Sequence, residues 1–160
     1  MSEPKLIYLA VPYTHPNREV IELRFKAVNK VAAKLMAGGA FVFSPISHTH
    51  PIAEEGELLK GWDYWKTYDR LMISKSNMVM VLKLPGWVDS VGVAGELLIA
   101  DELKIPITYI EYEPDETFNK LVALEKDKKN FEVKTSVCNF DNSDTCVFTT
   151  NRYPECISFL

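Results

Sequence analysis

The sequence has few of the residues that build disulfide frameworks and metal sites. It contains three cysteines and three histidines in 160 residues. Cys138, Cys146 and Cys156 all lie near the C-terminus, and their odd number and spacing match no zinc pattern. We therefore expect a cytoplasmic protein with free thiols, the alternative being one C-terminal disulfide. His48 and His50 have no obvious third ligand, so we predict no metal and no cofactor, and expect them to bind substrate or hold their loop.

The sequence also lacks a long apolar run and an excess of positive charge. No segment approaches the roughly 20 apolar residues of a membrane span, and residues 1–5 do not resemble a secretory leader. The net charge of −4 argues against a broad basic surface for polymeric nucleic acid. A local cationic pocket for one phosphate is compatible with that charge. The expected partner is a small molecule.

What is present is an alternation of strand-like and helix-like segments. The strand-like runs are residues 5–11, 40–43, 78–84 and 105–110. The helix-like segments are residues 17–36, 54–76, 91–103 and 115–129, the second with a break at Gly61 left open. Alternation of this kind predicts right-handed crossovers and a parallel sheet. We therefore predict a three-layer α/β/α sandwich, flavodoxin-like or Rossmann-like, with four to five strands, and a loop over residues 44–51.

The character of the chain changes from Asn130 onward. Residues 131–135 and 146–150 alternate between apolar and polar side chains, with a turn-like segment between them. This pattern predicts a hairpin or a short C-terminal β extension. The expected organisation is one α/β domain over residues 1–129, with residues 130–160 packed on it or on a neighbouring subunit.

Polar side chains follow the first three predicted strands, where the carboxyl ends of a parallel sheet gather ligand-binding loops. In chain order these candidates are Tyr8, Tyr13, Thr14, His15 and Arg18; then Ser44, Ser47, His48 and His50; and finally Asp89, Ser90 and Glu96. Arg18 fits either a surface cation at a helix start or a bidentate partner for a phosphate.

The segment from Pro85 to Glu96 is the centre of this arrangement. Gly92 would let the backbone approach a ligand closely, and the free N–H groups of a helix start favour an anion. Glu96 lies among small apolar residues and is either a functional carboxylate or a solvent-facing one. Trp87 is expected in the core or in a pocket wall, with stacking on a base as the second option.

A second acid, Asp69, precedes the third strand on a predicted helix. From the residues alone we favour a solvent-facing position for it, beside Arg70. If Asp69 and Glu96 faced one pocket, they would suit displacement at an acetal-like carbon. One carboxylate would attack or stabilise an oxocarbenium ion, while the other would orient the sugar or move a proton.

Three segments give the sequence a family resemblance: residues 7–16, 68–81 and 89–100. With them, the chain resembles the nucleoside 2-deoxyribosyltransferase superfamily, which includes 2′-deoxynucleoside 5′-monophosphate N-glycosidases. Residues 43–51 and 85–87 are typical of its uncharacterised bacterial and phage branch. The resemblance implies an enzyme that cleaves the N-glycosidic bond of a 2′-deoxynucleoside or its 5′-monophosphate, by hydrolysis or base exchange.

The resemblance also implies roles for single residues. Glu96 would attack the anomeric carbon, Asp69 would bind the sugar or assist protonation, and Tyr8 would position Glu96 or the sugar. Ser90 matches a serine that contacts phosphate in the monophosphate glycosidases. Asp89, one residue earlier, matches the acid of the free-nucleoside transferases if the alignment shifts by one.

The chain departs from that family at several places, and one alternative function stays open. Thr14, His15 or Arg18 would have to replace a glycine–serine stretch that some relatives use for phosphate, and Asn77 stands where an aspartate is usual. Relatives complete their pocket with a neighbouring subunit, which implies a homodimer or higher homo-oligomer. The alternative is a non-catalytic nucleotide or nucleotide-sugar sensor on the same fold.

Overall fold

The computed structural model describes residues 4–59 and 61–135 of the chain. The chain divides into two units, residues 1–124 and residues 125–160. None of the helices within the described ranges combines the length and apolar character needed to cross a membrane. The predicted strand at residues 146–150 and the three cysteines lie outside the described residues.

The first unit is built on a sheet of four parallel strands in the order β2-β1-β3-β4. The strands are β1 (Leu6–Ala10), β2 (Phe41–Phe43), β3 (Met78–Lys83) and β4 (Ile107–Glu111). β1 lies between β2 and β3, with Tyr8 opposite both Phe43 and Val79. The predicted parallel α/β sheet is confirmed, and its carboxyl edge carries the loops that the sequence analysis singled out.

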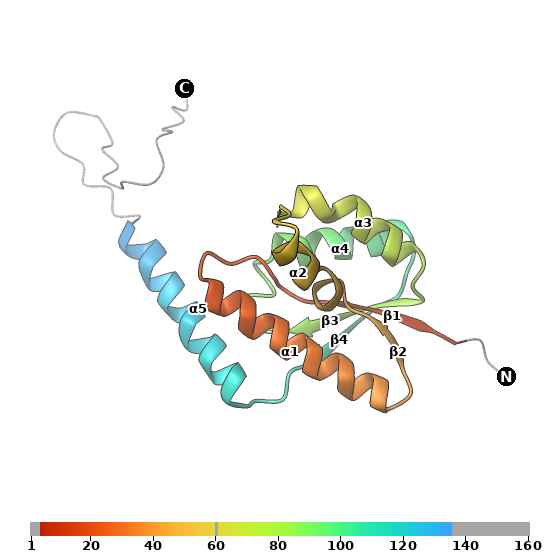
Figure 1. The fold of residues 1–160 in the computed structure, drawn as a ribbon, viewed down its shortest axis with the longest axis horizontal. Helices are drawn as coiled ribbons and strands as arrows, with labels where there is room; N and C mark the ends of the chain where they lie inside the picture. The colour runs from red at the N-terminus through yellow and green to blue at the C-terminus, as the bar shows by residue number, and fades with distance from the viewer. Residues whose placement is uncertain (1–3, 60, 136–160) are drawn as a thin grey trace, which may run out of the picture. The chain divides into compact units, whose positions relative to one another are not determined.

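Helices cover both faces of this sheet, which gives three layers (Figure 1). α1 (Arg18–Ala37) packs on one face around Leu9 and Leu82, and the part of α5 (Glu116–Thr135) up to residue 124 packs there through Leu121. α3 (Trp62–Ser74) and α4 (Val91–Glu102) pack on the other face, around Tyr8 and Val81. The Tyr8 side chain therefore belongs to the α3–α4 side of the sheet.

The predicted loop over residues 44–51 is wrong, because these residues begin the helix α2 (Pro45–Glu55). Ser44 caps this helix by accepting a hydrogen bond from the Ser47 amide, and Pro45 occupies the first turn, where a missing N–H costs nothing. Pro51 lies inside the helix and drew the prediction toward a loop. The predicted helix over residues 54–76 is interrupted, because α2 ends at Glu55 and α3 begins at Trp62, with Gly61 as its N-cap.

The predicted β character of residues 131–135 is also wrong, because α5 runs to Thr135. Alternation over five residues carries little weight against the helical periodicity that precedes it on the same chain. A hairpin therefore cannot begin at residue 131.

The pairing of α3 with α4 depends on Gly95. A Cβ placed on Gly95 would lie 2.2 Å from Cζ2 of Trp62, so the indole ring fills the space where a side chain would be. Asp69 and Ile73 follow Trp62 at helical spacing, and both are buried. The close approach at Gly95 therefore brings the Asp69 side of α3 against α4, the helix that carries Glu96.

Candidate functional site

The centre of the candidate site is a buried hydrogen bond between Tyr8 and Glu96. The Tyr8 hydroxyl of β1 donates to Oε1 of Glu96 over 2.7 Å, across 88 residues of sequence. Tyr8 is fully buried, and Glu96 is 5% exposed. The other carboxylate oxygen, Oε2, is buried and has no hydrogen-bond partner among the described residues. One oxygen of Glu96 is thus fixed while the other remains available.

Asp69 completes this cluster from α3. It is 6% exposed, so the expectation that it faces solvent is wrong. The Tyr8 hydroxyl acts on its pKa, and its charge acts on Glu96, so the three groups lie close together. We call Tyr8, Asp69 and Glu96 the acid cluster. The sheet supplies its hydroxyl, and the two helices that meet at Gly95 supply its carboxylates.

Burial perturbs every member of the acid cluster. Burial raises the pKa of Asp69 to about 6, although the hydrogen bond from Tyr8 lowers it. Burial and then the charge of Asp69 raise the pKa of Glu96 well above its usual value, again against the Tyr8 hydrogen bond. The pKa of Tyr8 is raised by burial first and then by Glu96 and Asp69. Two carboxyl groups buried close together in an apolar setting thus hold their protons to a higher pH than free carboxyl groups do.

The loop between β3 and α4 contributes the second group of predicted residues. Ser90 is the N-cap of α4, and its Oγ accepts from the Val93 amide over 3.3 Å. Ser90 and Gly92 are half-buried, whereas Asp89 is exposed. A capping hydroxyl accepts through its oxygen and keeps its own proton to donate. Ser90 is thus the better placed of the two for an anionic group.

Trp87 lies in the same loop but packs toward β4. Its half-buried ring lies 5.8 Å from that of Tyr109, and the Lys83 ammonium lies within 6.0 Å of both rings. Trp87 also packs against the α3–α4 side of the core. This agrees with the first expectation for Trp87, a position in the core or a wall.

The loop between β1 and α1 is held in place from beneath by Arg24. This buried guanidinium donates to the carbonyls of Tyr13 and Thr14 over 3.3 and 3.2 Å, and to that of Pro85 over 3.0 Å. It therefore ties the β1–α1 loop to the β3–α4 loop. His15 is buried in the first loop, where Nδ1 accepts from the Asn17 amide, and Thr14 is exposed.

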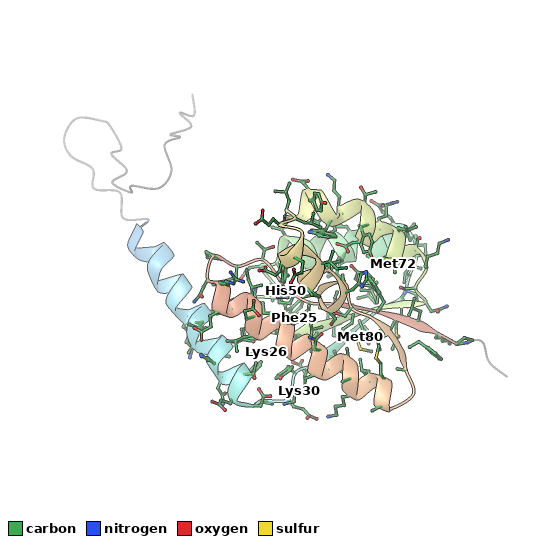
Figure 2. The ribbon with its side chains drawn as sticks, viewed as in Figure 1. Phe25, Lys26, Lys30, His50, Met72 and Met80 are labelled. Carbon is green, nitrogen blue, oxygen red and sulfur yellow. The ribbon has the colours of Figure 1, made fainter. Side chains whose placement is uncertain are left out.

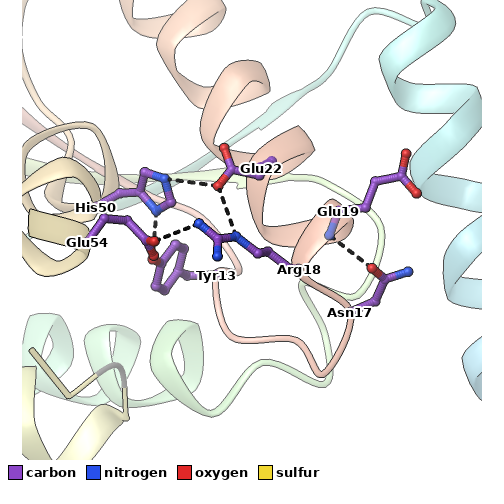
Figure 3. A network of polar contacts seen from close by, with 7 residues as sticks. All are labelled: Tyr13, Asn17, Arg18, Glu19, Glu22, His50 and Glu54. Carbon is purple, nitrogen blue, oxygen red and sulfur yellow. Dashed lines mark hydrogen bonds and ion pairs between the residues drawn. The ribbon is translucent and has the colours of Figure 1, made fainter. Parts of the chain in front are cut away.

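Arg18 belongs to a separate network at the start of α1, shown in Figure 3. Its guanidinium, whose side chain is 77% exposed, lies 2.9 Å from Glu54 and 4.0 Å from Glu22. His50 places Nδ1 2.7 Å from the Tyr13 hydroxyl and Nε2 3.5 Å from Glu22. We call these five residues the loop network. Figure 2 shows His50 beside Phe25, between α1 and α2. The centroids of the two rings lie 4.3 Å apart.

The two remaining predicted residues come from α2 and its start. Ser44 is buried, and its hydroxyl oxygen is occupied as the cap of α2. His48 is exposed, and its ring lies near those of Phe43 and Tyr68. His48 and His50 therefore have different neighbours. Over residues 4–59 and 61–135, no group of three or more His, Cys, Asp or Glu side chains could hold a metal ion.

Of the predicted residues, the structure joins Tyr8, Asp69 and Glu96 in one cluster. Arg24 was missed, although a signal was available: it lies four residues from Val20 on the apolar face of α1. A cation at such a position is buried and must find acceptors.

Comparison with known proteins gives a family but no relative of known activity. The family described as "Domain of unknown function (DUF1937)" matches residues 5–112. This match spans the four strands, α1 to α4 and the whole acid cluster. No curated protein matches the sequence.

Proposed function

The chain belongs to the DUF1937 family, and we propose that it cleaves the N-glycosidic bond of a 2′-deoxynucleoside or its 5′-monophosphate. The observation that carries the proposal is the unequal state of the two Glu96 oxygens. Oε1 accepts from Tyr8, while Oε2 is buried without a hydrogen-bond partner among the described residues. An oriented carboxylate with one uncommitted oxygen, held away from water, suits attack on an anomeric carbon.

In the proposed reaction, Oε2 of Glu96 forms a bond to the anomeric carbon as the bond from that carbon to the base breaks. The leaving nitrogen takes the electron pair of the broken bond and needs a proton. Asp69, whose pKa burial raises to about 6, would take up the proton that Glu96 gives up on becoming the nucleophile and pass it to that nitrogen. Water or a second base then resolves the glycosyl-enzyme, which gives hydrolysis or base exchange.

Tyr8 has a supporting role in this scheme. Its hydroxyl donates to Oε1 of Glu96 and lies near enough to Asp69 to lower the pKa of that group, so it fixes Glu96 beside the second carboxylate. Its own pKa is raised well above 10.0, which keeps the hydroxyl protonated and able to donate. Tyr8 is therefore a positioning residue that stabilises the Glu96 anion during attack.

The start of α4 supports a phosphorylated sugar. Ser90 can donate its hydroxyl proton, and Gly92 leaves the first turn of the helix without a side chain between Ser90 and a ligand. The nearest atom to a Cβ on Gly92 would be Ser90 Oγ, at 3.8 Å. Free N–H groups at a helix start favour an anion. Asp89 would repel a phosphate, but its side chain lies at an exposed position.

The experiment is incubation of the full chain with each 2′-deoxynucleoside and 5′-monophosphate, with and without a second free base, followed by chromatography. We expect release of the base, and a new nucleoside with the second base if the enzyme is a transferase. Mass spectrometry of a quenched reaction should show a deoxyribosyl adduct on the peptide that contains Glu96. Binding of the nucleotide with no base release would instead support a sensor.

A further inference from the structure

The three elements that carry the acid cluster supply no positive charge to its carboxylates. β1 and α4 contain no lysine, arginine or histidine. α3 contains two basic residues, and both are exposed. Lys66 lies 3.0 Å from the carboxylate of Asp63. Arg70 lies 2.6 Å from that of Glu102. Both basic side chains of α3 are therefore engaged by other acids at the surface.

The basic side chains of the adjoining loops are also engaged elsewhere. Arg24 donates to backbone carbonyls of both loops. Lys83, at the end of β3, donates to Glu111 over 2.6 Å. Apart from burial, the groups that shift the pKa of Glu96 belong to the acid cluster itself, and none of them is basic. The acid cluster therefore receives no compensating positive charge from the part of the chain that the structure describes.

This arrangement leaves a requirement of the Glu96 carboxylate unmet. Glu96 and Asp69 are 5% and 6% exposed, and Oε2 of Glu96 is buried without a hydrogen-bond partner among the described residues. An ionised carboxylate in such a setting is costly unless a cation or hydrogen-bond donors meet it. Attack on the anomeric carbon nevertheless requires this oxygen in its ionised form. A positive charge on the substrate, next to the anomeric carbon, would supply the missing partner.

We propose that the acid cluster selects nucleosides whose base is positively charged at the ring nitrogen bonded to the sugar, as in an N-glycosyl pyridinium; this inference rests on the proposed function. Oε2 of Glu96 forms a bond to the anomeric carbon while the bond from that carbon to the ring nitrogen breaks. The nitrogen takes the electron pair, so the base leaves in neutral form and needs no proton. Water then displaces Glu96 as a carboxylate and gives up one proton. Hydrolysis thus yields the sugar, the neutral base and a proton.

The protons held by the acid cluster give this preference a measurable signature. Burial raises the pKa of Asp69 to about 6 and that of Glu96 well above its usual value. A cation that binds beside these groups favours their ionised forms, so its binding releases protons, whereas a neutral ligand leaves the protons in place. Tyr8 faces both carboxylates and keeps its proton, because its pKa is raised well above 10.0.

The test uses two probes of the same shape and different charge. 1-Methyl-3-carbamoylpyridinium and 3-methylbenzamide share a planar aromatic ring, a methyl group and an amide. The ring atom that bears the methyl group is a positively charged nitrogen in the first and a carbon in the second. Calorimetry of the full chain at the pKa of Asp69, about 6, should show the cation bound at least about 10-fold more tightly. Only the heat of cation binding should vary with the ionisation enthalpy of the buffer.

Matched variants assign the preference to the acid cluster. Glu96→Gln and Asp69→Asn keep the shapes of the two side chains but remove their charges, so each should reduce the preference for the cation and the proton release. Glu22→Gln is the control, because Glu22 belongs to the loop network and already lies beside Arg18 and His50. This variant should bind both probes as the wild type does. Circular dichroism should show all three variants folded.

A kinetic comparison separates a charged leaving group from a neutral one. Asp69→Asn should lower the turnover of a 2′-deoxynucleoside with a neutral base by roughly 10²-fold or more, the contribution of a general acid. With 1-(2-deoxyribosyl)-3-carbamoylpyridinium as the substrate, the same variant should lose less than about 10-fold, because this base leaves without a proton. Chromatography of the released bases measures both rates.

The outcomes distinguish this inference from the proposed function. Equal binding of the two probes, no binding of the pyridinium at millimolar concentration, or a preference unchanged in Glu96→Gln and Asp69→Asn would overturn the selection of positive charge, even if neutral nucleosides are cleaved. A preference for the cation that depends on both acids, without base release from any nucleoside, would leave the charge selection in place and refute the proposed function.

Discussion

The acid cluster and the loop network both contain two carboxylates and a tyrosine, but they differ in what surrounds the charges. In the loop network, a guanidinium and an imidazole face the carboxylates of Glu22 and Glu54, and Arg18 is largely exposed. In the acid cluster, Asp69 and Glu96 are buried, the charge of Asp69 acts on Glu96, and the Tyr8 hydroxyl donates to Oε1 of Glu96.

The paired charges of the loop network suit a stabilising role, whereas the buried like charges of the acid cluster suit a reactive one. Paired charges near the surface lose little free energy to desolvation and gain little from each other. Buried like charges shift each other's pKa values, which is a cost that stability does not explain and that catalysis can use. We therefore propose that the acid cluster carries the chemistry, whereas the loop network holds the β1–α1 loop against α2.

The largest expected effect is on turnover. Glu96→Gln keeps the shape of the side chain but removes the nucleophilic oxygen, so base release should fall by at least about 10³-fold. Glu22→Gln, the equivalent change in the loop network, should alter turnover by less than about threefold. Chromatographic assays of both variants check this contrast. Near-full activity of Glu96→Gln would remove the distinction between the two groups.

The next effect is on stability and follows from the sign of the Asp69 shift. The folded protein keeps the proton of Asp69 up to a pKa of about 6, whereas the ordinary pKa of an aspartate is 3.8. The native state thus binds the extra proton and loses stability as the pH rises through that window. Asp69→Asn should raise the free energy of unfolding by roughly 2–3 kcal/mol at about pH 8 and by much less near pH 4.

Urea unfolding at the two pH values measures this effect. Glu54→Gln is the control from the loop network, and its change in stability should stay within about 1 kcal/mol at both pH values. If Asp69→Asn lowered stability at the higher pH, the carboxylate would be a stabilising group and the contrast drawn above would fail.

A third effect is on the pH dependence of activity, where two variants should move in opposite directions. Attack requires ionised Glu96, so kcat/KM falls with acid through the raised pKa of that group. Asp69→Asn removes a charge that raises this pKa and should shift the acid limb to lower pH. Tyr8→Phe removes a hydrogen bond that lowers it and should shift the limb to higher pH. Shifts of the same sign would contradict the proposed assignment.

The smallest expected effect concerns Arg18. Its guanidinium is engaged by Glu54 and Glu22, so Arg18→Ala should change stability by less than about 1 kcal/mol.

Ser90→Ala should raise the KM for the monophosphate while leaving that for the nucleoside unchanged. If the KM for the monophosphate rose more in Arg18→Ala than in Ser90→Ala, Arg18 would have to leave Glu54 and Glu22 to bind the phosphate.

The sheet and most of its helices could be predicted, because buried strands and one-sided helices leave periodic patterns in the sequence. The failures are local. At Ser44 and Pro45, a helix start was hidden by a second proline, Pro51. Residues 131–135 belong to the long helix α5, and no proline or glycine interrupts that helix before them.

The candidate site was predictable only in part. That Glu96 lies on the helix after the third strand followed from the sequence pattern, whereas its burial was left open and its catalytic role came from the family resemblance. The burial of Asp69 did not, since α3 carries polar residues on most of its surface and its inward face is set by tertiary packing. The tie made by Arg24 joins residues 61 positions apart, and no local pattern encodes such a contact.

Gly95 has a consequence for how the reaction could be altered. The carboxylates of Asp69 and Glu96 sit on different helices, and the Trp62 ring against Gly95 limits how near those helices come. The separation of two catalytic carboxylates decides whether a glycosidic bond is cleaved with retention or inversion at the sugar. A residue without a side chain therefore acts as the spacer of the site. Replacing Gly95 with a larger residue, together with a smaller ring in place of Trp62, would change the separation of the two carboxylates. Such a pair of changes offers a way to switch between retention and inversion at the sugar while both acids stay in place.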